Sequence, residues 1–215
     1  MHNVKLIRKM TGTAMLTALI FIFQLIGNYI SIQGVSINLA LLPIAIGAIM
    51  YGPWVGLFLG VVNGILVLPG SALFFEMSIM GTILTCIIKT GTAGFVAGWV
   101  FKLFKGKARI PGMFISALLV PIINTGIFLV AASTIFRPGL KELLGATNEN
   151  FGVVLFSAFI GINFIFEVVS TILLSPSIVM VIKRFVKSET TGDDIGDNLY
   201  KSKEELAYND SEENK

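Results

Sequence analysis

Long, uninterrupted apolar runs constrain this chain more than any other feature. A helix needs about 20 mostly apolar residues to cross the hydrocarbon core of a membrane. The runs are continuous and lack the period-two alternation of half-buried strands, so they favour helices over strands. The sequence therefore predicts an all-α integral membrane protein with six transmembrane helices. Six segments qualify as spans: 10–30, 36–51, 54–69, 74–103, 111–134 and 152–184.

Charged residues are scarce and unevenly distributed. They make up 13% of the chain, against about 25% in a soluble domain. Residues 188–215 hold nine acidic residues and three lysines, a composition that cannot bury enough apolar surface to fold. We therefore expect a transmembrane substrate-binding domain at 1–187 and a disordered acidic cytoplasmic tail at 188–215.

Basic residues predict the orientation. They flank apolar runs instead of lining a polar face. A location in the loops on one side of a membrane explains them better than nucleic-acid binding. With an even number of spans, all three basic clusters lie on one side, which the positive-inside rule makes cytoplasmic. Both termini are then cytoplasmic and loop 135–151 is outside. The first run is too long for a cleaved signal peptide, so we expect a retained helix. The clusters are Lys5, Arg8 and Lys9; Lys102, Lys105, Lys107 and Arg109; and Lys183, Arg184 and Lys187.

Small residues recur at helical spacing. Small side chains every fourth residue let two helix backbones approach closely in lipid. Packing within the chain explains most such pairs, but the pair on the first span, Ala14 and Ala18, has a second reading as a contact with a partner protein. The other pairs are Gly56 with Gly60, Gly60 with Gly64, and Gly94 with Gly98.

Polar residues inside the spans are the candidate site. A charge at mid-membrane costs about 2.5–3.5 kcal/mol on insertion scales, so such groups usually face the protein interior and have partners. Many of them fall in the outer half of the membrane or near its midplane, which suggests a pocket open to the outside. The candidate substrate-binding residues are Asn28, Asn38, Asn63, Glu76, Lys89, Asn124, Asn163 and Glu167.

Lys89 and Glu167 are candidate partners of each other. Each lies about 22 Å from the outer start of its span by the helical rise, and their charges are opposite. One reading is a buried ion pair that registers two helices. The other is that one of them meets a ligand of opposite charge, with asparagines supplying neutral hydrogen bonds.

Several chemistries lack the residues they need. His2 is the only histidine and Cys86 the only cysteine, so we expect no metal site and no cofactor. The chain has no phosphate-binding loop of the Walker A type, and no Ser-Lys or Asp-Asp arrangement for intramembrane hydrolysis. We therefore expect a protein that is not an enzyme.

The sequence resembles the substrate-binding S components of energy-coupling factor (ECF) importers. Its first span has a similar alanine-rich start around Ala14 and Ala18, and the stretch 37–44 leads into the Gly-Pro-x-x-Gly turn at 52–56. The fourth span contains the small-residue stretch 91–98. Size, six helices and cytoplasmic termini also fit, and the resemblance covers residues 10–185.

The resemblance implies a function and partners. It implies capture of a vitamin or related micronutrient near the outer leaflet, by a pocket built from the outer parts of several helices. It also implies assembly with a transmembrane coupling subunit, contacted through Ala14 and Ala18, and with two cytoplasmic ATPases. Pantothenate is the first candidate substrate, because Lys89 could meet an anion. A self-sufficient small secondary transporter and a non-transport membrane assembly protein remain as alternatives.

Overall fold

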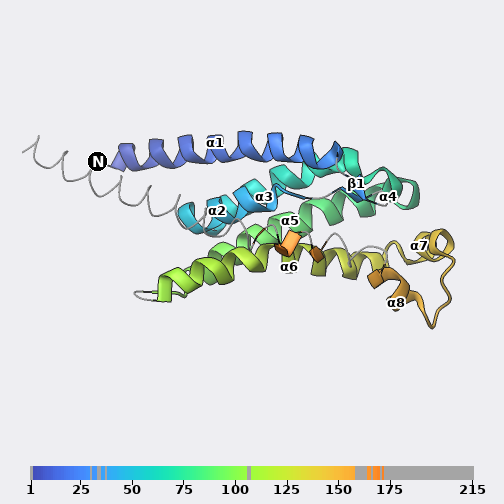
Figure 1. Ribbon diagram of the computed structural model, residues 1–215. Helices are drawn as coiled ribbons and strands as arrows, with labels where there is room; N and C mark the ends of the chain where they lie inside the picture. The colour runs from blue at the N-terminus through green and yellow to red at the C-terminus, as the bar shows by residue number, and fades with distance from the viewer. Residues whose placement is uncertain are drawn as a thin grey trace, which may run out of the picture. The chain divides into compact units, whose positions relative to one another are not determined.

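The computed structural model describes residues 2–29, 31–32, 35–36, 38–105, 108–157, 164–165, 167–169 and 171. Helices dominate these residues (Figure 1). The helices are α1 (His2–Tyr29), α2 (Leu41–Tyr51), α3 (Pro53–Val67), the 3-10 turn η1 (Leu68–Ser71), α4 (Ala72–Met77), α5 (Ile79–Phe101), α6 (Arg109–Thr134), α7 (Arg137–Leu144) and α8 (Phe151–Leu155).

The helices confirm the predicted fold class. Four helical stretches are long and apolar enough to cross a membrane, namely Leu6–Gly27, Pro53–Met77, Ile79–Phe101 and Arg109–Thr134, and Leu41–Tyr51 is a shorter apolar helix. Much of the sixth predicted span, 152–184, lies outside the described residues, as does the predicted tail at 188–215. Most of helix α8 and the helical residues 164–165, 167–169 and 171 fall within that span.

Two details differ from the expectations. Antiparallel strands β1 (Ser31–Ile32) and β2 (Val35–Ser36) form a small hairpin between the first two spans, where no strand was predicted. The predicted fourth span, 74–103, is divided at Ser78, whose backbone is extended and whose hydroxyl accepts a hydrogen bond from the Gly81 N–H at 3.1 Å. This cap ends one helix and starts the next. Between the third and fourth predicted spans, the short η1 helix continues α3 into α4.

A sharp turn connects α2 to α3. Gly52 adopts a positive φ of 96°, a conformation that glycine tolerates without steric cost. Pro53 follows at the first position of α3, where its missing N–H leaves no helical hydrogen bond unmade. The turn therefore packs α2 and α3 as an antiparallel pair.

The glycine pairs of the third and fourth predicted spans form one seam between α3 and α5. A Cβ on Gly60 would lie 2.6 Å from the carbonyl carbon of Thr90, so the two backbones touch here. The Thr90 hydroxyl donates a 2.6 Å hydrogen bond to the Gly60 carbonyl across the seam. A Cβ on Gly98 would likewise lie 2.7 Å from the Cα of Pro53. Packing within the chain accounts for these pairs.

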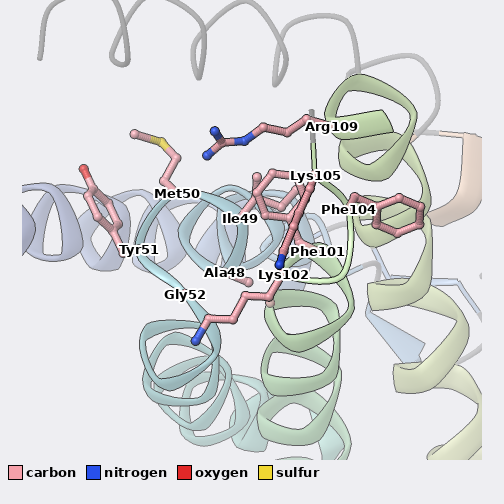
Figure 2. A pocket seen from close by; sticks show the side chains of 11 residues that line it. Ala48, Ile49, Met50, Tyr51, Gly52, Phe101, Lys102, Phe104, Lys105 and Arg109 are labelled. Carbon is pink, nitrogen blue, oxygen red and sulfur yellow. The ribbon is translucent and has the colours of Figure 1, made fainter. Parts of the chain in front are cut away.

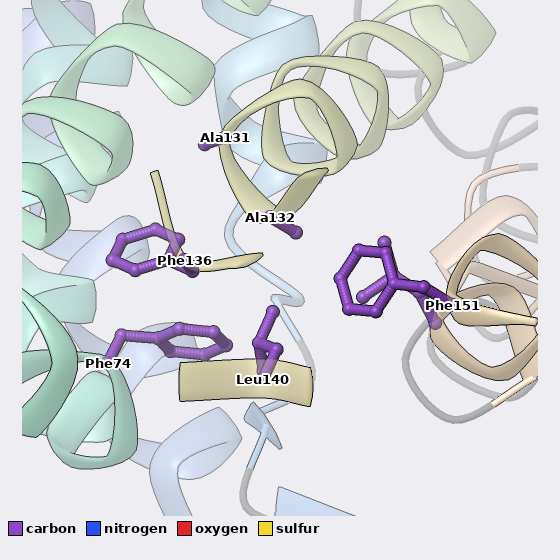
Figure 3. Packing of buried hydrophobic residues seen from close by; sticks show 7 residues of the cluster. Phe74, Ala131, Ala132, Phe136, Leu140 and Phe151 are labelled. Carbon is purple, nitrogen blue, oxygen red and sulfur yellow. The ribbon is translucent and has the colours of Figure 1, made fainter. Parts of the chain in front are cut away.

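An apolar cluster joins α4, α6, α7 and α8 (Figure 3). Phe136 and Leu140 are fully buried in it, and the Phe74 ring lies 5.1 Å from the Phe136 ring between centroids. The predicted loop 135–151 thus contains a helix, α7, whose buried side chains fix it against the ends of α4 and α6. We call this side of the molecule the α7 end, and the side with the α5–α6 connection the link end.

Candidate functional site

Three asparagines meet inside the helix bundle. Asn38 precedes α2, Asn63 lies on α3 and Asn124 on α6, and their exposed fractions are 6%, 0% and 4%. The Asn63 amide nitrogen donates a 3.3 Å hydrogen bond to the Asn38 side-chain oxygen. Burying an amide is unfavourable unless its polar atoms find partners. We call these asparagines, together with Lys89, Thr125 and Glu167, the buried polar cluster.

The Glu167 carboxylate joins the asparagines from the sixth predicted span. The Thr125 hydroxyl donates a hydrogen bond to it at 3.3 Å. The Asn124 side chain and the backbone N–H of Asn38 also lie near this carboxylate. Hydrogen bonds from neutral donors stabilise a carboxylate away from water. Asn38, which lies 129 positions before Glu167 in the chain, is therefore brought beside its carboxylate.

Lys89 lies on α5 beside the same cluster. Its ammonium is 5.4 Å from the centroid of the Phe128 ring, a favourable arrangement for a cation over an aromatic face. Its charge is close enough to attract Glu167, but in the described part of the chain the two form no direct ion pair. The structure brings Lys89 and Glu167 together without closing a salt bridge between them.

Some polar atoms of the cluster have no partner among the described residues. They are the Asn38 nitrogen, the Asn63 oxygen and the Asn124 oxygen of the side-chain amides. An unsatisfied buried polar group costs about 1–3 kcal/mol, and native structures rarely leave several in one place. A ligand or water molecules at this position would satisfy them.

Three predicted site residues are not among these groups. Glu76 lies on the short helix α4, and its side chain is exposed. The break at Ser78 explains this difference, because it removes Glu76 from the helix that carries Lys89. Asn28 lies in the last turn of α1, with its side chain outside the description, and Asn163 lies outside the described residues.

Ala14 and Ala18 face outward from α1. Both are exposed, whereas Gly12 on another face of the helix packs against the Tyr51 ring. Ala14 borders a groove of about 590 Å³ between α1 and α3, whose lining includes Trp54 and Phe58. These two aromatic side chains are 71% and 52% exposed. The sequence analysis did not single them out, although their spacing of four residues places them on one helix face.

The fold and the buried polar cluster define a helical integral membrane protein with polar side chains gathered in its interior. The family model "ECF transporter, substrate-specific component" matches residues 8–182, so the chain belongs to this family. Searches of curated proteins and of solved structures found no match. The chain is thus the substrate-specific membrane component of an ECF transporter, as the sequence resemblance predicted.

Proposed function

We propose that this component captures a water-soluble vitamin or related micronutrient from the outer side of the membrane, in the buried polar cluster. The observation that carries the proposal is the set of unsatisfied amide atoms on Asn38, Asn63 and Asn124. They lie with a carboxylate, Glu167, that accepts a hydrogen bond from Thr125, and with an ammonium, Lys89, that has no direct counter-ion in the described residues. Asn28 and Asn163 remain candidate substrate-binding residues on the basis of their positions in the sequence.

Pantothenate is the first candidate substrate. It carries one carboxylate, one amide and two hydroxyl groups, so it needs a cation together with neutral donors and acceptors. Lys89 offers the cation, and the asparagine amides offer both donors and acceptors. A buried site built to hydrogen-bond polar groups strongly rejects analogues that lack them. The cluster therefore suits a small polar anion better than an apolar ligand.

The basic side chains support an orientation with the link end in the cytoplasm. Lys102, Lys105 and Arg109 lie around the α5–α6 connection. Lys9 is near the start of α3, next to the α2–α3 turn that also borders this connection. Positive residues concentrate on the cytoplasmic side of membrane proteins. The α7 end would then face outside, and both termini would be cytoplasmic.

The partners would be a transmembrane coupling subunit and two cytoplasmic ATPases. The exposed alanines of α1 allow a partner helix to approach closely, and the groove beside Ala14 offers an apolar surface with Trp54 and Phe58 for it to cover. ATP hydrolysis would be carried out by the ATPase subunits, and this chain would supply substrate binding.

Co-purification tests the assignment of partners. The tagged chain is expected to isolate a coupling subunit and ATPases as one complex. The variant Ala14→Trp should lose this complex, while Ala72→Trp, which changes an exposed alanine on α4, should keep it. Vitamin uptake by the chain alone in proteoliposomes, without ATP, would instead identify a self-sufficient secondary transporter.

A further inference from the structure

A basic hollow lies at the link end of the bundle, away from the buried polar cluster (Figure 2). Its volume is about 450 Å³, and it is enclosed by the α2–α3 turn, the end of α5 and the start of α6. Figure 2 shows the side chains of Lys102 and Arg109 extending from the α5–α6 connection toward the α2–α3 turn. Its lining includes the apolar side chains of Ile49, Met50 and Phe104 and the basic side chains of Lys102, Lys105 and Arg109.

The charge of the hollow has one sign. Three of its lining side chains are cationic and exposed, and none of the described residues that line it is acidic. The Arg109 guanidinium lies 5.7 Å from the centroid of the Phe101 ring, which holds it in place while its N–H groups remain available to an anion. Like charges gathered in a concave site attract an anion more strongly than they would on a flat surface.

The rest of the lining is apolar. Ile49 and Met50 come from the last turn of α2, and Phe104 comes from the α5–α6 connection. The hollow lies where the membrane-spanning helix α5 ends at Phe101 and α6 begins at Arg109. This position corresponds to the level at which lipid head groups meet the hydrocarbon core. A ligand that fits must therefore be anionic at one end and apolar at the other.

We propose that this hollow binds the phosphate head group of an anionic phospholipid. Lys102, Lys105 and Arg109 would contact the phosphate, and Ile49, Met50 and Phe104 would contact the glycerol and the first methylene groups. Basic pockets between transmembrane helices recognise such head groups through the same chemistry. A free phosphate would bind the cationic side chains but leave the apolar lining without a partner. The lining therefore favours a phosphate that belongs to a lipid. The bound lipid would fix the link end at the membrane surface.

The experiment measures lipid binding to the full chain purified in detergent. Native mass spectrometry compares phosphatidylglycerol with phosphatidylcholine of the same acyl chains, and inorganic phosphate is tested as a separate ligand. We expect one phosphatidylglycerol to bind with clear preference over phosphatidylcholine. Each basic group contributes about fivefold at an anionic lipid surface, so the double variant Lys102→Gln, Arg109→Gln should lose about 25- to 30-fold in affinity.

Two further variants make the experiment specific. The pair Arg137→Gln, Lys141→Gln removes the same charges at the α7 end and should keep the preference. The pair Lys102→Arg, Arg109→Lys retains both positive charges and should retain the preference for phosphatidylglycerol. This result would separate loss of charge recognition from damage to the fold by substitution at these positions. Melting temperatures without lipid verify that each variant is folded.

Three results would overturn the proposal. The first is equal binding of the two lipids by the unchanged protein. The second is full competition by inorganic phosphate, which would make free phosphate the ligand. The third is phosphatidylglycerol binding that arises only after removal of residues 188–215, which would make that acidic segment the occupant of the hollow.

Discussion

Replacing Lys89 by methionine tests the chemistry of the buried polar cluster. The change removes the ammonium and keeps a long, flexible side chain. Breaking a buried ion pair typically costs about 3–5 kcal/mol, but Lys89 forms no direct ion pair in the described residues, and its ammonium lies 5.4 Å from the Phe128 centroid. A lost cation–π contact costs about 1 kcal/mol. We therefore expect Lys89→Met to lower the free energy of unfolding by only about 1 kcal/mol.

Ligand affinity should fall much more than stability. A hydrogen bond to a charged group contributes about 1.5–3 kcal/mol. At 1.36 kcal/mol for each factor of ten, removing the Lys89 contact to a substrate carboxylate should raise the Kd about 10- to 150-fold. Pantothenate is the probe, and its Kd is measured by calorimetric titration of the detergent-purified chain.

The double-mutant cycle with Glu167→Gln distinguishes a structural Lys89–Glu167 pair from a contact between Lys89 and the ligand. Thermal unfolding and pantothenate binding are measured for both single variants and for the double variant. Lys102→Met is the matched control. It makes the same change at the residue that follows α5, about 20 Å from Lys89 along the helix direction. Lys102→Met should leave the Kd unchanged. Large stability losses in both single variants, recovered in the double variant, would show a structural pair and refute the ligand reading. Additive effects on both readouts would show that the two residues do not interact.

Three further predictions concern the fold and its surfaces. Ala14→Trp should abolish uptake while the isolated subunit keeps its substrate affinity, since the bulky ring blocks helix approach; loss of both would indicate packing within the chain. Cysteines at Lys105 and Asn148, in a background without the native cysteine, should be labelled by an impermeant reagent in intact cells only at position 148, and labelling at 105 alone would reverse the orientation. Gly60→Ala should lower the free energy of unfolding by about 1–3 kcal/mol through overpacking, because its Cβ would lie 2.6 Å from the carbonyl carbon of Thr90. Gly126→Ala has open space around its Cβ and should not lower it. Equal melting temperatures of the two variants would contradict the close packing of α3 against α5.

The helices and their close packing could be predicted from the sequence. Hydrophobic length and glycine spacing are local properties, and they predicted that the glycine pairs pack within the chain. Only the structure shows that the pairs of α3 and α5 pack against each other. The break at Ser78 could not be predicted in this way. The apolar run continues across it, and the break becomes visible in the extended backbone of Ser78 and in the hydrogen bond between its hydroxyl and the Gly81 N–H.

The buried polar cluster could be predicted in part. The cost of burying charge marked Lys89 and Glu167, and counting helical rise placed them at one depth. Depth gives no information on rotation about the helix axis, so it could not identify Phe128 as the ring beside Lys89. Glu76 could not be excluded because the break at Ser78 was not predicted. The basic hollow was also beyond prediction, because it depends on a turn at Gly52 that brings two distant segments together.

The central claim is that the chain is a substrate-binding subunit for a vitamin-like molecule. Its most direct test is a mass spectrum of the small molecules released by denaturing the detergent-purified protein. The account predicts one polar, vitamin-like compound in a near-stoichiometric amount, absent from Asn124→Leu preparations of the same fold and retained in the surface variant Lys102→Met. Two results together would contradict the claim: the unchanged protein releases no such compound, and it binds pantothenate and related vitamins no better than the Asn124→Leu variant does.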